Sequence, residues 1–309
     1  MKRTHRAAAF VLGIAADALV GDPPNVVHPV RAIGISARLY DGVARNRFAP
    51  RKAGVLGALA IPTAAALLAT ASVFAGRRQR GGRVLAAASA ISLASAQRTL
   101  MRRAIEVADA LESGDLDEAR RLLAYHLVSR PTADLDAGEV AGAAIESVAE
   151  NLGDGVAGPW LAFAVAGAGG AWAYRALNTL DSLWGYRNER YAEFGWAAAR
   201  LDDLANLAPA RLGAAAICIA AQRRGRGMPA FEAWRRDARL TESPNAGHPM
   251  AAMAGALGVA LSKDGHYVLG AGMRAPDAAD IRAAVEVARG ASIVMAGACL
   301  AVIAARGAR

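Results

Sequence analysis

Lysine, cysteine and aromatic residues are scarce in this chain, and each shortage excludes a class of protein. Only three lysines stand among 36 basic residues, and no basic run alternates with aromatic side chains. The formal charge of +9 therefore does not indicate a nucleic-acid-binding surface. Cys218 and Cys299 both lie inside apolar runs, where a thiol packs as a small hydrophobic side chain. We expect neither a disulfide framework nor a zinc site.

The short motifs of nucleotide binding and covalent catalysis are also missing. The chain has no G-x-x-x-x-G-K-[ST] loop and no G-x-G-x-x-G fingerprint, so a P-loop would not hold any nucleotide here. It also lacks H-E-x-x-H, G-x-S-x-G and the protein-kinase signatures. The carboxylates and arginines that are present favour electrostatic handling of a phosphorylated substrate together with a metal ion.

Apolar residues are abundant, at 54% of the chain with a mean hydropathy of +0.22, which is high for a soluble protein. Residues 53–76 carry no charge over a length that exceeds the roughly 20 residues a transmembrane helix needs. Further apolar runs cover residues 84–97, 155–174, 204–222 and 290–305. No segment alternates clearly enough to demand a sheet. We therefore expect a mainly α, polytopic integral membrane protein with about four or five membrane helices.

Polar stretches separate these runs within what we expect to be one membrane-embedded domain, residues 1–309. Residues 98–127 show helical periodicity broken by "SGD" at Ser113–Asp115, which predicts a helical hairpin. Residues 98–140 and 223–289 are expected to lie outside the bilayer. The run at 84–97 is short, and we expect it to continue as one helix into the charged stretch that follows. Asp17 opposes reading residues 1–20 as a cleaved signal peptide.

A row of carboxylates stands directly before the apolar run at residues 155–174. If residues 141–154 form a helix, Glu146, Glu150 and Asp154 follow one another at i, i+4 and share a face. Like charges at this spacing repel, and a cation would reverse that effect. Magnesium suits such oxygen ligands and leaves room for phosphates. The alternative is a solvated helix end that leads into the bilayer.

Two more polar clusters flank the next apolar run. Asn178 and Asp181 are spaced at i, i+3, and Asp202 pairs with Asn206 at i, i+4. Arg211 lies inside an apolar run, and an ionisable residue at membrane depth is a functional hypothesis by default. Its alternative is an ion pair with Asp202 or Asp203 that joins two helices.

Near the N-terminus, prolines make a rigid turn that carries Asp22, His28 and Arg31. A single histidine in a loop is more often structural than catalytic, but the flanking prolines fix its backbone. Two further polar loops, "VSRPT" at Val128–Thr132 and "SPNAG" at Ser243–Gly247, are of the kind that presents backbone groups to a ligand.

Four long segments, taken together, resemble the CobD/CbiB family, the adenosylcobinamide-phosphate synthases of cobalamin biosynthesis. They occur in order along the chain and are very specific: "GDPPNVVHPVRAIG", "IESVAENLGDGVAGP", "NTLDSLWGYRNERYAEFGWAAARLDDLANLAPARL" and "SPNAGHPMAAMAGALGV". The resemblance implies an integral membrane enzyme, a ligase that joins adenosylcobyric acid, a corrinoid, to aminopropanol or its phosphate through an amide. It also implies ATP as co-substrate and Mg²⁺ as cofactor.

The resemblance and the residue chemistry together suggest roles for the polar side chains. Candidate catalytic residues are Glu146, Glu150, Asp181 and His28. Candidate metal ligands are Glu150, Asp154, Asp181, Asp202 and Asp203. Candidate substrate- and phosphate-binding residues are Asp22, Arg31, Arg130, Asn151, Asn178, Arg187, Asn188, Arg190, Arg200, Arg211, Ser243 and Asn245. Arginine suits phosphate because its guanidinium binds bidentately.

Location and partners follow from the same reasoning. We expect a multi-pass protein of the cell membrane with its active site facing the cytoplasm, where ATP is found, and with other membrane-bound cobalamin enzymes as possible partners. Two alternatives stay open. One is an intramembrane magnesium-dependent transferase acting on a pyrophosphate substrate, although Asp181 and Asp202 are too far apart in sequence for the compact aspartate motifs of such enzymes. The other is a non-catalytic transporter or scaffold, although no internal symmetry is visible.

Overall fold

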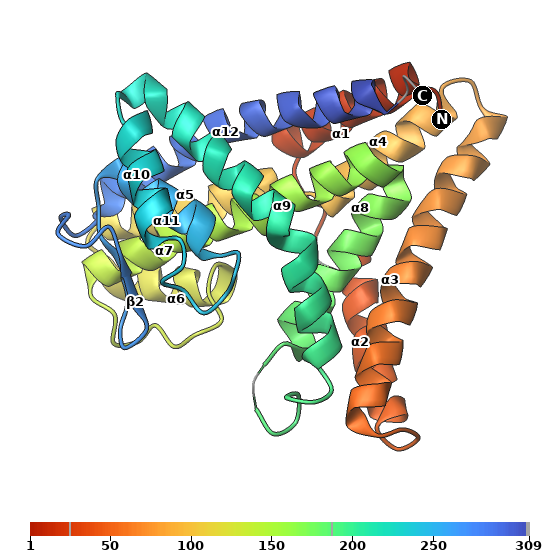
Figure 1. Cartoon of the computed structure of the whole chain (residues 1–309), viewed down its shortest axis with the longest axis horizontal. Helices are drawn as coiled ribbons and strands as arrows, with labels where there is room; N and C mark the ends of the chain where they lie inside the picture. The colour runs from red at the N-terminus through yellow and green to blue at the C-terminus, as the bar shows by residue number, and fades with distance from the viewer. Residues whose placement is uncertain (25, 187, 307–309) are drawn as a thin grey trace. The chain divides into compact units, whose positions relative to one another are not determined.

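The structure, a computed structural model, describes residues 1–24, 26–186 and 188–306, and helices make up most of it (Figure 1). In chain order the elements are α1 (Arg3–Leu19), α2 (Pro29–Ala44), α3 (Pro50–Ala75), η1 (Gly76–Arg78), α4 (Gly82–Ala94), α5 (Gln97–Glu112), α6 (Leu116–His126), α7 (Ala137–Asn151), η2 (Leu152–Ala157), α8 (Gly158–Trp184), α9 (Trp196–Ala221), η3 (Gln222–Arg224), α10 (Gly227–Asp237), α11 (Gly247–Leu257), β1 (Leu261–Lys263), β2 (Tyr267–Leu269) and α12 (Ala278–Ala305).

Membrane-spanning character is clear from helix length and composition. Within the described ranges, five helical segments are long and apolar enough to cross a membrane: Pro50–Arg78, Gly82–Glu112, Ala137–Trp184, Trp196–Arg224 and Ala278–Ala305. The first of these exposes Leu59, Leu67 and Leu68, as a lipid-facing helix does. The protein is a polytopic helical membrane protein, which confirms the predicted fold class.

The chain forms two compact units, and each is built from separate stretches of sequence. Unit 1 comprises Met1–Ala96, Gly158–Asn206 and Ala298–Arg309, and unit 2 comprises Gln97–Ala157 and Leu207–Gly297. The stretches predicted to lie outside the bilayer, residues 98–140 and 223–289, both belong to unit 2.

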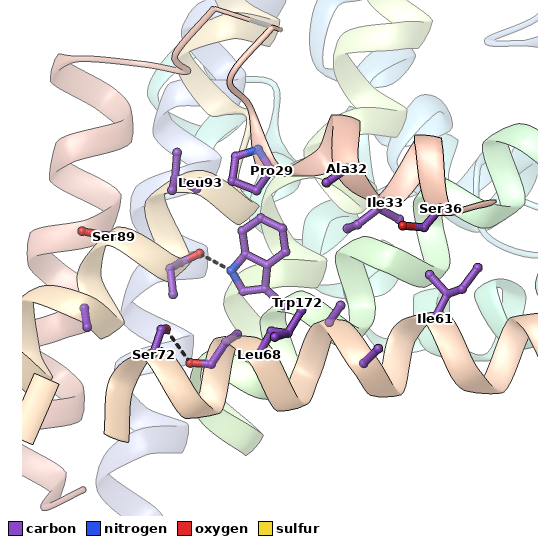
Figure 2. A pocket seen from close by; sticks show the side chains of 15 residues that line it. Pro29, Ala32, Ile33, Ser36, Ile61, Leu68, Ser72, Ser89, Leu93 and Trp172 are labelled. Atoms are coloured by element: carbon purple, nitrogen blue, oxygen red, sulfur yellow. Dashed lines mark hydrogen bonds between the residues drawn. The ribbon is translucent and has the colours of Figure 1, made fainter. Parts of the chain in front are cut away.

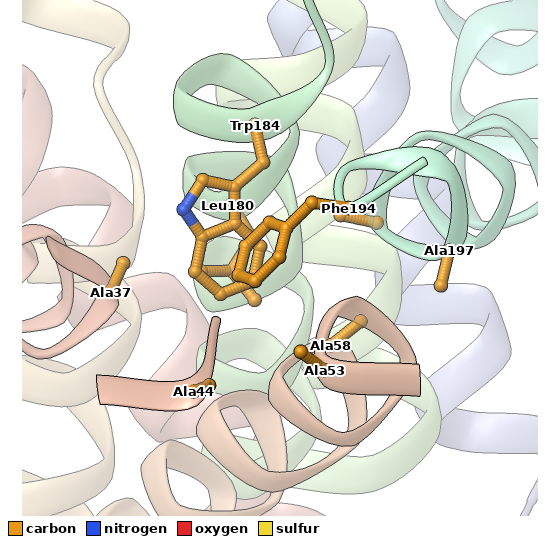
Figure 3. Packing of buried hydrophobic residues seen from close by; sticks show 9 residues of the cluster. Ala37, Ala44, Ala53, Ala58, Leu180, Trp184, Phe194 and Ala197 are labelled. Carbon is orange, nitrogen blue, oxygen red and sulfur yellow. The ribbon is translucent and has the colours of Figure 1, made fainter. Parts of the chain in front are cut away.

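In unit 1, small residues let the helices pack closely. Helix α1 packs on α4, α3 runs along α8, and α2 contacts both α3 and α8 (Figure 1). At one end of α8, Trp184 meets Phe194 edge to face with ring centroids 4.8 Å apart, surrounded by alanines of α2 and α3 (Figure 3). This contact holds the loop between α8 and α9 against α3.

In unit 2, α6 and α7 both begin at side-chain caps. The Asp115 side chain accepts from the Glu118 amide at 2.9 Å and starts α6, which confirms the predicted break in the hairpin of residues 98–127. Asp136 and Glu139 form a capping box at the start of α7. Helix α7 then packs against α5, α6, α11 and strand β1, and is buried along most of its length.

The expected continuous helix through residues 84–97 is interrupted: α4 ends at Ala94 and α5 begins at Gln97, although the two together make one of the five candidate membrane spans. Ser95 is extended, and its hydroxyl donates to the Ile91 carbonyl at 2.8 Å and accepts from the Trp160 indole at 2.9 Å. The indole comes from α8, 65 residues away, so a contact distant in sequence fixes the break. Conversely, residues 278–289, which we expected to lie outside the bilayer, and the apolar run at 290–305 form the single helix α12.

The predicted α-helix at residues 141–154 is correct only as far as Asn151. The next segment, η2, is a π-helix, whose i→i+5 bonds widen the turn. Glu146 and Glu150 keep their i, i+4 relation in α7, whereas Asp154 lies in η2. The three carboxylates therefore do not form one regular α-helical row.

Candidate functional site

In unit 1, three aspartates gather where α8 ends and α9 begins. Asp181 lies three residues before the end of α8, and Asp202 and Asp203 lie near the start of α9. The three carboxylates are close enough for their charges to interact, and Asn178 of α8 also faces Asp202. With Asn206, these residues are called the Asp202 cluster below. The contact between Trp184 and Phe194 supports it by fixing the connecting loop.

The two carboxylate oxygens of Asp202 differ in their hydrogen bonding. Its Oδ2 accepts from the Asn206 side-chain amide at 2.8 Å, and the Tyr174 hydroxyl donates to Asn206 Oδ1. Only 7% of Asp202 is exposed, yet its Oδ1 has no hydrogen-bond partner among the residues that the structure describes. A buried carboxylate oxygen without a partner requires an explanation, such as a bound cation.

The donor set of the Asp202 cluster fits Mg²⁺. Across the described parts of the chain, no group of three or more histidine, cysteine, aspartate and glutamate side chains has the arrangement of a metal site. Mg²⁺ demands less, since it commonly takes one or two carboxylates and completes its shell with water and substrate phosphates. The open oxygen of Asp202, with the Asp181 carboxylate beside it, supplies oxygen ligands of that kind.

In unit 2, a small polar pocket of about 190 Å³ forms around Glu146. Its walls, which define the Glu146 pocket, come from Leu127, Val128, Ser129, Arg130, Ala143, Glu146, Ser147, Glu150, Met250, Lys263 and Tyr267. Arg130 Nη2 lies 3.6 Å from Glu146 Oε2. Glu146 is 6% exposed, and its Oε1 has no hydrogen-bond partner within the described residues.

The wall of the Glu146 pocket depends on contacts between separate segments. The Ser147 hydroxyl donates to the Leu127 carbonyl at 2.8 Å and so holds the segment before Arg130 against α7. On the opposite side, β1 and β2 pair antiparallel with Lys263 opposite Tyr267. Directly paired residues point to the same face of a hairpin, and both of these side chains line the pocket. Burial, followed by the charge of Glu146, raises the pKa of Tyr267, so its hydroxyl stays protonated.

A larger cavity in unit 1, of about 480 Å³, has a different character. It lies between α2, α3, α4 and α8, and Figure 2 shows Trp172 in it beside apolar side chains and a few serines. The Trp172 indole donates to the Ala90 carbonyl at 2.9 Å. Among the residues that the structure describes, no charged side chain lines this cavity, so it is unsuited to phosphates or to a metal.

A comparison with protein families identifies the chain. The family model described as "CobD/Cbib protein" matches residues 10–291. The chain belongs to the CobD/CbiB family.

Similar proteins named "Cobalamin biosynthesis protein CobD" occur in distant bacteria. The chain is 43% identical to one from Geobacter metallireducens over 269 residues, which cover 85% of this chain and 84% of the relative. It is 45% identical to one from Stutzerimonas stutzeri over 79% of this chain and 78% of the relative. It is 40% identical to one from Mycobacterium tuberculosis over 96% of this chain and 94% of the relative. No solved structure matches the chain.

In this CobD/CbiB chain, the N-terminal turn brings Asp22, His28 and Arg31 together locally. His28 caps α2, since its Nδ1 accepts from the Val30 amide at 3.1 Å, and its Nε2 lies 3.5 Å from the Asp22 carboxylate. The Arg31 guanidinium donates to the Val26 carbonyl at 3.3 Å. These contacts give the three residues a structural role, and their roles in substrate binding and proton transfer stay predictions.

The loop between α8 and α9 uses several of the residues predicted to bind phosphate. Arg190 donates to Asp41 Oδ2 at 2.9 Å, and Asn188 Oδ1 accepts from the Tyr191 amide at 3.0 Å. Arg187 lies outside the described residues. Arg190 and Asn188 therefore shape this loop, and phosphate contacts from them remain a prediction.

The other predicted arginines and their neighbours have local contacts. Arg200 lies 3.7 Å from Asp203 in α9. The Arg211 guanidinium donates to the Leu207 carbonyl at 2.8 Å and to Asn245 Oδ1 at 3.4 Å. These contacts differ from the ion pair with Asp202 or Asp203 that the sequence left open as an alternative. The Ser243 hydroxyl accepts from the Asn245 amide at 3.2 Å and shapes the turn before α11.

Residues near the end of α7 divide between the pocket wall and the helix itself. Glu150 lines the Glu146 pocket, as does Arg130. Asn151 donates to the Ser147 carbonyl at 3.0 Å within α7. Asp154 belongs to η2 and is not among the pocket's lining residues.

Sequence reasoning missed Tyr174, Lys263 and Tyr267. The Tyr174 hydroxyl donates to Asn206, which in turn donates to Asp202. The spacing of Asn206 from Asp202 was visible in the sequence, but Asn206 was not chosen as a site residue. Lys263 and Tyr267 flank "DGH", and an Asp-Gly pair between strand-forming residues is a hairpin signal. That signal could have predicted the hairpin, but it does not predict that the hairpin packs against α7.

Proposed function

We propose that this chain catalyses ATP-dependent amide formation in cobalamin biosynthesis. It would join the propionate carboxylate of adenosylcobyric acid to aminopropanol or its phosphate, giving adenosylcobinamide or its phosphate. Family membership and relatives named for cobalamin biosynthesis support the pathway. The residue chemistry of the two units supports the reaction type.

The reaction requires activation of the acid, since a carboxylate does not condense with an amine in water. In the first step a carboxylate oxygen attacks the terminal phosphorus of ATP, the bridging P–O bond breaks, and ADP leaves. In the second step the amine nitrogen attacks the acyl carbon, the C–O bond to phosphate breaks, and phosphate leaves. A base takes the proton that the amine loses.

The observation that carries the proposal is the open Oδ1 of buried Asp202 beside Asp181 and Asp203. Mg²⁺, when bound, would neutralise charge on the ATP phosphates. Asp181 and Asp202 would hold it. The bonds from Tyr174 through Asn206 fix the other oxygen of Asp202, so the open oxygen is oriented before any ligand arrives.

The proposed base that takes the amine's proton is Glu146 or Glu150. Glu146 is buried, and its Oε1 has no hydrogen-bond partner among the described residues, so this carboxylate can accept the proton that the amine loses. A buried site also keeps water away from a reactive acyl phosphate. Glu150 stands one turn further along α7 and lines the same pocket.

The direct test incubates the detergent-solubilised protein with adenosylcobyric acid, aminopropanol phosphate and Mg-ATP, followed by mass spectrometry. We expect a new amide and one ADP for each amide formed. A transporter or scaffold would yield no amide, and a transferase using a pyrophosphate substrate would turn over without ADP. Either result would sink the proposal.

Variants then test the assigned residues. Asp181→Asn, Asp202→Asn and Glu150→Gln should each lower amide formation by about a hundredfold or more while the protein still inserts and purifies normally. Asp117→Asn is a matched control, since the Asp117 side chain is 94% exposed on α6. Normal turnover in the three variants would remove those residues from the site.

A further inference from the structure

Four helices of unit 1 enclose a small pocket that the proposed reaction does not use. The N-terminal end of α1, the last turns of α3, the start of α4 and part of α8 meet there (Figure 1). The pocket has a volume of about 220 Å³. It is lined by Arg6 of α1, Thr70 and Phe74 of α3, Arg83 of α4 and residues 166–169 of α8, and is called the Arg6–Arg83 pocket below.

The Arg6–Arg83 pocket carries positive charge without a carboxylate to balance it. Within the described residues, two guanidinium groups and no acidic side chain line it. The stretches of sequence that supply its walls, residues 1–16, 42–105 and 155–180, contain no aspartate or glutamate. Two cations that face one small space repel each other, and an anion between them reverses that effect.

Basic side chains at the opposite end of α3 do have acidic partners. Arg45 and Arg190 both pair with Asp41, and Arg51 lies 3.8 Å from Glu193. The positive charge of the loops is therefore balanced by carboxylates of the protein at that end of α3. At the Arg6–Arg83 pocket the balancing charge has to come from a ligand.

A kink in α8 shapes the wall of the pocket. Gly167 has φ 72° and ψ −158°, which departs from helical geometry and favours glycine. A Cβ at Gly167 would lie 3.8 Å from Arg6 Nη2, so the Arg6 guanidinium reaches the kinked backbone. Arg306 donates to the Val165 carbonyl at 2.8 Å and adds a third guanidinium beside the kink. Residues 166–169 are alanine and glycine, which leave room for a ligand next to Arg6.

The pocket lies where α3 leaves the bilayer. The segment that contains α3 is the least buried of the five candidate membrane spans, so it faces lipid. Phe74 is exposed in its last turn, and the Arg77 guanidinium lies 3.6 Å over the Phe74 ring. Leu67, seven residues earlier on the same face, is also exposed. A lipid bound here has its headgroup at the arginines and an acyl chain beside Leu67.

The volume limits what the pocket encloses. At about 220 Å³ it is smaller than the roughly 300–1,000 Å³ that enclose drug-sized ligands. A phosphate with a few attached carbons fits, whereas a nucleoside triphosphate or a corrinoid does not. Guanidinium groups bind phosphate oxygens bidentately, and basic pockets between membrane helices bind anionic headgroups.

We propose that the Arg6–Arg83 pocket binds the headgroup of an anionic phospholipid, with its phosphate between the two guanidinium groups. The bound lipid joins α1, α3 and α4 to the kink of α8. Asp181 lies about 20 Å further along α8 at 1.5 Å per residue, so the lipid site is separate from the Asp202 cluster. The inference does not depend on the proposed function.

The test measures lipid binding to the detergent-solubilised full chain by native mass spectrometry. Dioleoyl phosphatidylglycerol and dioleoyl phosphatidylcholine carry the same acyl chains, so a difference in affinity reports the charge of the headgroup. We expect the first phosphatidylglycerol to bind at least about tenfold more tightly than phosphatidylcholine. Equal affinities would overturn the proposal.

Variants assign the preference to the pocket. Arg6→Gln and Arg83→Gln should each lower the preference for phosphatidylglycerol by about threefold or more, and Arg6→Lys should lower it less because the charge is kept. Arg83 is exposed, so its replacement should not disturb folding. Arg47→Gln is the matched control, since it removes an exposed arginine before the opposite end of α3. An equal loss of preference in Arg47→Gln would show general surface attraction and would contradict a site.

A soluble phosphate ester distinguishes the source of the phosphate. Glycerol phosphate carries the chemistry of the headgroup without acyl chains. We expect it to leave bound phosphatidylglycerol in place at millimolar concentration, because it gains nothing from the exposed face of α3. Displacement of the lipid would show that the pocket takes a soluble phosphate, and the lipid assignment would be wrong.

Discussion

At Asp202, one carboxylate oxygen is fixed by the protein and the other is left open. The bond from Asn206 at 2.8 Å and the support of Tyr174 hold the side chain in one orientation. Burying the other oxygen without a donor carries a free-energy penalty of about 1–3 kcal/mol or more for a charged group. An unpaired, buried carboxylate oxygen next to two more aspartates lowers the stability of the helix but suits Asp202 to binding a cation.

Tyr174→Phe tests whether this orientation matters. Removing the hydroxyl leaves Asn206 free to rotate, so Asp202 loses its fixed position although no proposed metal ligand is removed. We expect the Mg²⁺ concentration that gives half-maximal amide formation to rise several-fold, with a smaller change in kcat at saturating Mg²⁺. The measurement is a magnesium titration of the amide-forming reaction.

A purely structural role for Tyr174 would lower thermal stability and leave the magnesium dependence unchanged. Tyr186→Phe is the control, because Tyr186 is exposed in the loop after α8. Magnesium curves that superimpose for Tyr174→Phe and the unmodified protein would contradict the positioning role.

Asp41 is the residue whose charge should govern the acid stability of unit 1. Burial raises the pKa of this carboxyl, but hydrogen bonds from Arg190 and Arg45 outweigh burial, so the pKa lies below its ordinary value. A carboxyl with a lowered folded pKa stabilises the protein above its unfolded pKa, near 4, and that stabilisation disappears as pH falls through the folded pKa.

Asp41→Asn should therefore destabilise the protein by about 1–3 kcal/mol at neutral pH. The difference from the unmodified protein should shrink as the pH falls from about 4, the pKa of the unfolded carboxyl, through the lower pKa of folded Asp41. Melting temperatures in detergent between neutral and acid pH provide the check. A difference that stays constant down to acid pH would show that the ion pairs with Arg190 and Arg45 contribute nothing.

Among the elements, α3 and the loop after α8 approach one another closely at Gly54. A Cβ at this position would lie 1.8 Å from the Phe194 carbonyl oxygen, a backbone atom that cannot move alone. Gly54→Ala should push the loop away from α3 and lower stability by about 1–3 kcal/mol, as overpacking does. Thermal melting in detergent measures the loss.

Gly42→Ala in α2 is the matched control. A Cβ there meets nothing within 4 Å, so alanine should stabilise the helix by about 0.5–1 kcal/mol. The same sign of change in both variants would contradict the close approach at Gly54.

The elements also show where sequence reasoning succeeds and where it stops. The uncharged run at residues 53–76 predicted α3 to within three residues at its start and one at its end, because a helix satisfies the backbone of a long apolar segment in lipid. The hairpin of β1 and β2 was missed, since three-residue strands are too short for alternation to be visible. The end of α4 was missed because the indole of Trp160, far along the chain, holds Ser95.

The candidate site follows the same pattern. Asp202 and Asn206 are one helical turn apart, so their pairing was visible in the sequence. The contact between Arg190 and Asp41 joins residues 149 positions apart, and that between Tyr174 and Asn206 joins residues 32 apart. Such pairings depend on helix packing, which periodicity does not encode. The widened turn in η2, which moves Asp154 out of the α-helical row, likewise has no sequence signal that we recognised.

For the whole molecule, the proposed reaction constrains how the chain sits in the membrane. ATP is present on the cytoplasmic side, so the end of unit 1 that carries the Asp202 cluster and the mouth of the Glu146 pocket in unit 2 should both be reached from the cytoplasm. Two exposed residues can carry reporters for these sites. They are Glu189, in the loop between α8 and α9, and Ser129, directly before Arg130.

Single cysteines at Glu189 and Ser129, in a background where Cys218 and Cys299 are alanine, should react with a membrane-impermeant maleimide in inside-out vesicles. They should be protected in right-side-out vesicles until detergent is added. Both side chains are exposed, so burial does not limit their labelling. If Glu189→Cys and Ser129→Cys label from opposite sides of the membrane, the two sets of carboxylates do not both face the cytoplasm, and the proposed reaction is contradicted.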